Sequence, residues 1–96
     1  MQFTKKLREG VRRGDITTSF RVWQSPRVKV DGRYPVEGGH VVVTSIREID
    51  WRDVSDSLAR ESGFRNLVDL MQTAKHGSGH KLYFIRFRFE GTDHAL

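Results

Sequence analysis

Hydrophobic residues near the start of the chain recur at every fourth position. Phe3, Leu7 and Val11 follow this spacing, and most residues between them are charged. Side chains four positions apart lie on one face of an α-helix, so the pattern predicts an amphipathic helix. Thr4 can cap its N-terminus, and Gly14 is suited to end it. We therefore expect a first helix between these two residues.

The next part of the chain is rich in β-branched and aromatic residues and is divided by turn signals. Residues Thr17 to Trp23 have the composition of a strand, which Ser25-Pro26 would end. Residues Arg27 to Val30 alternate in polarity before the Asp31-Gly32 pair, which favours a short strand or hairpin arm followed by a turn. Glu37-Gly38-Gly39 predicts the next turn.

Two longer strands are expected in the middle and at the end of the chain. Residues Val41 to Ile49 form the longest β-rich run of the first half, which indicates a central strand. Residues Lys75 to His80 are expected to form a loop, Lys81 to Phe89 the final strand, and Gly91 onward a frayed tail. Alternation along the final strand places Tyr83, Ile85, Phe87 and Phe89 on one face and Leu82, Phe84, Arg86 and Arg88 on the other.

Between these two strands the hydrophobic period is helical. Asp50 or Asp53 can start a helix that has Glu61 in its last turn and Gly63 as its stop. Residues Phe64 to Met71 continue with helical spacing, so a second short helix is expected after a bend. Together with the flanking strands, this order predicts an α+β protein.

Composition limits the range of structures and functions. The chain has 96 residues and one continuous series of apolar segments, so we expect a single domain over residues 1–96. It has no cysteine, which leaves no disulfide, thiolate metal site or cysteine nucleophile. The apolar runs are too short to span a bilayer, and charges rather than an apolar segment follow the first residues, so we expect no signal peptide and a cytoplasmic location.

Positive charge is concentrated in the first third of the chain. The whole sequence carries a formal charge of +5; residues 1–33 hold nine Lys or Arg against three acids, whereas residues 48–69 hold three Arg against six acids. Such a division is what a protein that orients on a polyanion needs. A generally basic surface without a specific partner is the alternative, and charge alone does not separate the two.

The segment after the first helix combines a glycine, hydroxyl residues and an arginine. Hydroxyls and a guanidinium donate several hydrogen bonds, which makes them good ligands for phosphates and base edges. The segment resembles the ASCH domain, a member of the PUA-like group of small RNA-associated barrels, whose first strand opens Gly-x-Lys-Thr-x-Thr-x-Arg. Gly14, Thr17, Ser19 and Arg21 match this motif, while Ile16 stands where the family has lysine.

Two further segments are similar to the same family, in its small bacterial single-domain type. Residues Leu58 to Phe64 resemble its second landmark, in which an acidic residue precedes a Gly-Phe pair, and Tyr83 to Phe89 resemble its closing strand. The resemblance implies a small mixed PUA-like β-barrel of about five to six strands with two to three helices. It also implies a cleft lined by the start of the first strand and by Glu61.

RNA binding is the function that the resemblance and the residues together favour. The expected partner is RNA or a nucleoside or nucleotide, held without a cofactor or a metal. Arg21, Thr17 and Ser19 can contact phosphate, sugar or base edges, and other cations extend the basic rim. The full set of expected RNA- or ligand-binding residues is Arg12, Arg13, Thr17, Ser19, Arg21, Tyr83, Arg86 and Arg88.

Hydrolysis is the alternative within the same family. The family is associated with ribonuclease activity and, in one branch, with removal of the acetyl group of N4-acetylcytidine. Its nucleophile and helix-end acid would correspond here to Ser19 and Glu61 as catalytic residues. The family lysine, which would supply the base, is replaced by Ile16, and an aliphatic side chain can neither accept a proton nor stabilise an oxyanion.

Aromatic, acidic and histidine residues could each have a role in binding. Trp23 or Tyr34 could stack on an unpaired base, but packing in the core or at the barrel rim is favoured for Trp23 and Trp51. A protein-interaction module would instead use the acidic helical part, near Asp53, Asp56 and Asp69. No histidine pair has the spacing of a metal site on a regular element, so we expect no metal.

Overall fold

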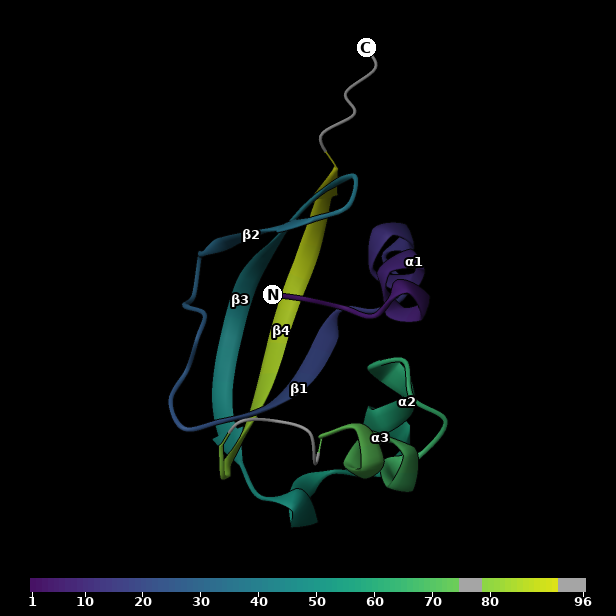
Figure 1. Ribbon diagram of the computed structural model, residues 1–96, viewed down its shortest axis with the longest axis vertical. Helices are drawn as coiled ribbons and strands as arrows, with labels where there is room; N and C mark the ends of the chain where they lie inside the picture. Colours follow the sequence, from purple (N-terminus) through teal and green to yellow (C-terminus); the bar gives the residue numbers. More distant parts are fainter. Residues whose placement is uncertain (75–78, 92–96) are drawn as a thin grey trace.

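A computed structural model describes residues 1–74 and 79–91 and contains a four-stranded antiparallel sheet flanked by three α-helices (Figure 1). The α+β class is therefore confirmed. The elements in chain order are α1 (Lys5–Arg13), β1 (Thr18–Trp23), β2 (Arg33–Val36), β3 (Gly39–Ile49), the 3-10 helix η1 (Trp51–Asp53), α2 (Asp56–Glu61), α3 (Leu67–Ala74) and β4 (Lys81–Gly91).

Helix α1 begins and ends at the residues that the sequence indicates. The Thr4 Oγ1 atom accepts a hydrogen bond from the Leu7 N–H at 3.4 Å. Gly14 ends the helix in a left-handed conformation, with φ of 80°, and its N–H donates to the Val11 carbonyl at 3.1 Å. Val11 is fully buried, so the helix packs its apolar face inward.

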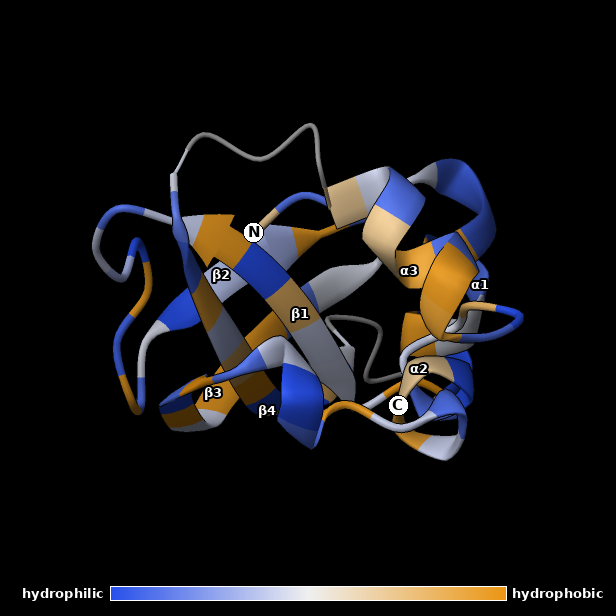
Figure 2. Cartoon of the chain, turned by 90° about the horizontal axis from the view of Figure 1, so that it is seen from below, coloured by the Kyte–Doolittle hydropathy of each residue, from blue (hydrophilic) through white to orange (hydrophobic). Residues whose placement is uncertain are grey.

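The strands are ordered β1-β4-β3-β2, which makes β4 and β3 the inner pair and leaves β1 and β2 at the edges. Ile85 of β4 lies opposite Ser19 of β1 and Ile46 of β3, and the register of β3 shifts between Val43 and Ser45. This irregularity bends a strand and strengthens its twist, in keeping with the curled shape of the sheet. The helices lie on the β1 side of the sheet in both views (Figures 1 and 2).

Both faces of the sheet bury hydrophobic residues. On one face, Tyr83, Ile85 and Phe87 of β4 join a core that also contains Val11 of α1. On the other face, Leu82 and Phe84 pack with residues of α2 and α3. The predicted division of the β4 side chains between two faces is therefore confirmed. Along β1, Figure 2 shows a hydrophilic segment between two hydrophobic ones.

The described residues contain fewer strands than the sequence analysis expects, four rather than five or six. The predicted strand over Arg27 to Val30 is wrong. Val28 is buried, but the Lys29 N–H donates to the Tyr34 hydroxyl at 2.8 Å, and the Lys29 carbonyl accepts from the Gly32 N–H at 2.9 Å. Hydrogen bonds within a turn thus take the place of strand pairing over Arg27 to Val30, and β2 begins only after this turn.

The predicted helix from Asp50 or Asp53 is divided into two parts. Asp50 caps the short η1, and Ser55 caps α2, where its Oγ atom accepts from the Leu58 N–H at 3.1 Å. Two capping side chains five residues apart start two separate turns, which breaks the helix.

The remaining boundaries shift by a few residues. The second predicted helix forms later, as α3, and Gly91 belongs to β4 rather than to a tail. Most of the predicted loop, and residues 92–96 of the predicted tail, fall outside the described residues. Among the described residues no helix is both long enough and apolar enough to cross a membrane.

Gly14 and Gly63 offer a matched test of backbone conformation against packing. Both have positive φ, 80° and 95°, but a Cβ atom on Gly14 would meet nothing within 4 Å, whereas one on Gly63 would lie 2.8 Å from Ile16 Cδ1 and against Leu7. We expect Gly14→Ala to lower the free energy of unfolding by about 1–2 kcal/mol. Gly63→Ala should cost about 1–3 kcal/mol more because of the overlap. Urea denaturation measures both, and equal losses would contradict this packing at Gly63.

Candidate functional site

A pocket of about 320 Å³ lies along the open edge of β1. The consecutive residues Thr18 to Trp23 all line it, although alternate side chains of a strand point to opposite faces of the sheet. A pocket that reaches both sets must therefore lie beside the strand, in line with the sheet. Its other walls are formed by the N-terminal segment, including Phe3, and by residues of the α2–α3 region, including Ser62, Phe64 and Leu70.

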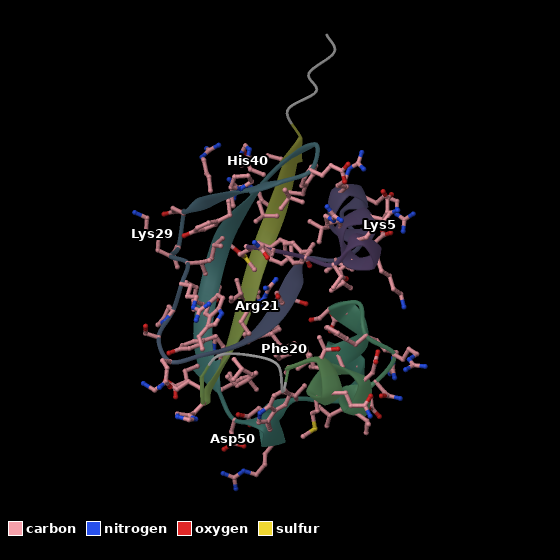
Figure 3. The ribbon with its side chains drawn as sticks, viewed as in Figure 1. Lys5, Phe20, Arg21, Lys29, His40 and Asp50 are labelled. Carbon is pink, nitrogen blue, oxygen red and sulfur yellow. The ribbon has the colours of Figure 1, made fainter. Side chains whose placement is uncertain are left out.

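Arg21 and Arg27 are the charged residues of the described pocket lining, and Arg21 is the more buried of the two. Its Nε atom donates to the Ser19 Oγ atom at 2.8 Å, and its Nη2 atom donates to the Gln2 carbonyl at 2.7 Å. The guanidinium lies over the Phe3 ring, with its carbon 5.0 Å from the ring centroid. Figure 3 labels Arg21 beside Phe20, the preceding residue of β1, whose side chain belongs to the other face of the sheet.

The Arg21 guanidinium is half-buried and has no carboxylate partner among the residues that the structure describes. None of the ion pairs within residues 1–74 and 79–91 includes it, and no described lining residue is acidic. Loss of solvent lowers the pKa of Arg21 below its ordinary value. The side chain remains a cation at neutral pH, so the pocket contains a partly desolvated positive charge held by neutral groups.

Two buried hydroxyls join β1 to the end of α2. Thr18 Oγ1 and Ser62 Oγ share a hydrogen bond of 2.7 Å, and the exposed fractions of these residues are 3% and 2%. Ser62 is the C-terminal cap of α2, so this bond places the helix end against the edge strand. Both residues also line the pocket.

The structure brings together part of the site predicted from the sequence. Ser19 and Arg21 line the pocket side by side, whereas Thr17 is exposed and does not line it. Glu61 is exposed at the end of α2 and is also outside the lining residues; its neighbour Ser62 lines the pocket instead. The Ser19 hydroxyl therefore has a guanidinium as its hydrogen-bond partner rather than a carboxylate.

The remaining predicted binding residues lie elsewhere. Arg12 and Arg13 are exposed in the last turn of α1 and pair with Glu9 and Asp15, at 3.3 and 3.2 Å. Arg86 and Arg88 are exposed on the face of β4 opposite the one to which Arg21 belongs. Tyr83 is buried in the core, with its ring centroid 6.0 Å from that of Trp23.

Several residues that could either contact a ligand or pack in the protein make packing or main-chain contacts in the structure. Trp23 is buried in the core and lines the pocket, and Trp51 is half-buried against the helices. Tyr34 uses its hydroxyl as an acceptor for the Lys29 N–H. Ile16, at the position where the resembled ASCH motif has lysine, packs between Gly10 and Gly63 at the edge of the core.

Charged groups on the far strands form a separate cluster. Glu90 Oε1 lies 2.9 Å from His40 Nε2, and Glu90 Oε2 accepts from Arg88 Nε at 3.1 Å. These hydrogen bonds lower the pKa of Glu90, whose side chain is partly exposed to solvent. Over the described residues no group of three His, Asp or Glu side chains could hold a metal ion.

Sequence reasoning missed Thr18, Ser62 and Phe3 as lining residues. Thr18 stands between two motif positions, but strand alternation gave no reason to place it in the same pocket as Ser19. Ser62 comes directly after Glu61, which the family pattern emphasised. A pocket at a strand edge is lined by side chains from both faces of the sheet, and a linear motif does not show which strand lies at an edge.

The hydroxyl pair can be tested by a double-mutant cycle. Thr18→Val and Ser62→Ala should each lower the free energy of unfolding by about 1–3 kcal/mol, because each leaves the other hydroxyl buried without a partner. The double variant should lose less than the sum of the two, since no unpaired hydroxyl then remains. Urea denaturation of the four proteins gives the coupling energy. Additive losses would contradict the bond.

Comparisons of the chain with protein-family models, with curated proteins and with solved structures find no match. The ASCH resemblance therefore depends on the motifs of the sequence alone. The function has to be argued from the chemistry of the pocket at the edge of β1.

Proposed function

We propose that this protein is an ASCH-type, PUA-like domain that binds RNA, or a nucleotide-like ligand, in the pocket at the edge of β1. The observation that carries the proposal is the half-buried Arg21 guanidinium without a carboxylate partner among the described residues. A cation that has lost part of its hydration is stabilised by an anion with oxygen acceptors. A phosphate group supplies these acceptors in a geometry that suits a guanidinium.

The surroundings of Arg21 favour a ligand that joins an anion to a flat apolar group. Ser19 and the Gln2 carbonyl hold the guanidinium in place, which reduces the entropy lost when an anion binds. Phe3, Phe20 and Phe64 contribute aromatic surface to the lining, and stacking on a base contributes about 1–3 kcal/mol. The pocket volume, about 320 Å³, is within the range of small-ligand sites.

Binding is favoured over catalysis by the partners of Ser19. A serine nucleophile needs a base within hydrogen-bond reach, and the partner of Ser19 is a guanidinium, which stays protonated. Glu61 is exposed and outside the lining, and Ile16 is packed against two glycines. N4-acetylcytidine is therefore expected to bind in the pocket without measurable turnover.

Fluorescence anisotropy with a labelled single-stranded RNA tests the proposal. Arg21→Ala should weaken binding at low salt by about tenfold or more, since a hydrogen bond to a charged group contributes about 1.5–3 kcal/mol. Affinity should also fall as salt increases, because phosphate contacts release counterions. Arg52→Ala is the matched control, because Arg52 is an exposed arginine paired with Asp50 outside the pocket.

The control variant should bind within about twofold of the unchanged protein, because Arg52 does not line the pocket. Its exposed ion pair with Asp50 contributes about 1 kcal/mol or less to stability, so the variant should remain folded. Thermal unfolding of each variant shows whether the fold is retained. RNA binding that is equal in the folded Arg21→Ala variant, or absent from the unchanged protein at low salt, would contradict the proposal.

A further inference from the structure

The main-chain groups of β1 that face away from β4 open into the pocket. Within residues 1–74 and 79–91, β1 is an edge strand that is paired on one side only. The Phe87 N–H donates to the Thr17 carbonyl at 2.9 Å, and Thr17 is opposite Phe87 when the β1–β4 register is continued by one residue. Antiparallel ladders bond alternate residues, so the N–H and C=O groups of Thr18, Phe20 and Val22 point away from β4.

The outward N–H and C=O groups of Thr18, Phe20 and Val22 have no main-chain hydrogen-bond partner in the part of the chain that the structure describes. Side chains from both faces of β1 line the pocket, so the outward groups of the strand lie between them. The edge therefore presents main-chain polar groups to a pocket whose remaining walls include apolar side chains such as Phe3, Phe64 and Leu70. A ligand that fills this space has to satisfy them.

We propose that the open edge of β1 binds the Watson–Crick edge of one unpaired base. This inference rests on the proposed function, because it assumes that a nucleotide occupies the pocket. An outward residue such as Phe20 offers an N–H donor and a C=O acceptor side by side. Every RNA base carries an adjacent donor and acceptor on its Watson–Crick edge, so two hydrogen bonds can form in the plane of the sheet.

The walls of the pocket suit a base in this orientation. A base that lies in line with the sheet turns one ring face toward the N-terminal segment and Phe3, and the other toward Phe64 and Leu70. Arg21 belongs to the first side and is available to the phosphate. A base that is already paired has its Watson–Crick edge occupied, so the pocket selects single-stranded RNA.

An extended peptide could use the same main-chain groups by adding a strand to β1. Two observations favour the base. The pocket of about 320 Å³ has the size of a small-ligand site, and its lining joins the Arg21 cation to three phenylalanine rings with no described acid. A peptide strand gains most of its affinity from a long row of main-chain bonds, which the six residues of β1 limit.

Methylated nucleotides test the recognition of the base edge. Isothermal titration calorimetry first ranks the four nucleoside 5′-monophosphates. The preferred one is then compared with two derivatives of equal charge. One carries methyl on the Watson–Crick edge, as in N3-methyluridine, N1-methylguanosine, N4,N4-dimethylcytidine or N6,N6-dimethyladenosine monophosphate. The other carries methyl on carbon, at C5 of a pyrimidine or C8 of a purine. We expect the first to bind at least about tenfold more weakly, and the second to bind within about threefold.

Amide hydrogen exchange followed by NMR tests the protein side. Binding of the preferred monophosphate should slow exchange at Phe20, and at Thr18 or Val22 if the base lies nearer to them. The inward amides of Ser19 and Arg21, already bonded to β4, should change little and serve as controls. A synthetic extended tetrapeptide at the same concentration should not slow amide exchange at Thr18, Phe20 or Val22.

The results separate this inference from the function on which it rests. Failure of every monophosphate and of inorganic phosphate to bind, in a folded protein, overturns the proposed function. Binding that depends on Arg21 but tolerates the Watson–Crick methyl overturns only the recognition of the base edge. Protection of the outward amides by the tetrapeptide alone assigns the edge to peptides and overturns the inference.

Discussion

The burial of β4 on both faces is the constraint on which the fold depends. One face gives Tyr83, Ile85 and Phe87 to the core beneath α1, and the other gives Leu82 and Phe84 to the core beneath α2 and α3. β4 is also an inner strand of the sheet, because it pairs with both β1 and β3. Toward the end of β4 the second face changes to arginine, and the helices no longer cover it.

This arrangement leaves β1 at an edge, between the two cores. Its side chains alternate between them, and the helices approach from the same side. The gap along the edge is only partly closed, by the N-terminal segment and by the region around Ser62. The pocket thus follows from the strand order, because an inner strand would have its outward main-chain groups hydrogen-bonded to a second neighbouring strand.

The proposed binding joins two features that the edge brings together. Arg21 supplies a cation held by Ser19 and by a main-chain carbonyl, and the strand supplies outward donors and acceptors. Ile16 stands where the motif that the sequence resembles has lysine, and it contributes packing between Gly10 and Gly63, which fits the proposed emphasis on binding. The exposed Arg86 and Arg88 lie on another surface of the sheet, where they raise the positive potential without touching the pocket.

The sequence by itself determined the features that depend on near neighbours. The Thr4 and Gly14 caps, the alternation of β4 and the α+β order could all be predicted, because capping and alternation act over a few residues. The sequence also placed Ser19 and Arg21 together, two positions apart on one face of a strand. Arg27 to Val30 shows the limit, since four alternating residues did not show that a tyrosine hydroxyl would replace a strand partner.

Only the tertiary structure decided which predicted residues share a site. Thr18 and Ser62, 44 positions apart, meet because α2 packs against β1. Arg86 and Arg88 separate from Arg21 because the β1–β4 register assigns them to opposite faces. Strand order and register depend on the burial of side chains that are distant in the sequence. A local hydrophobic pattern does not indicate which distant segment will cover that part of the chain.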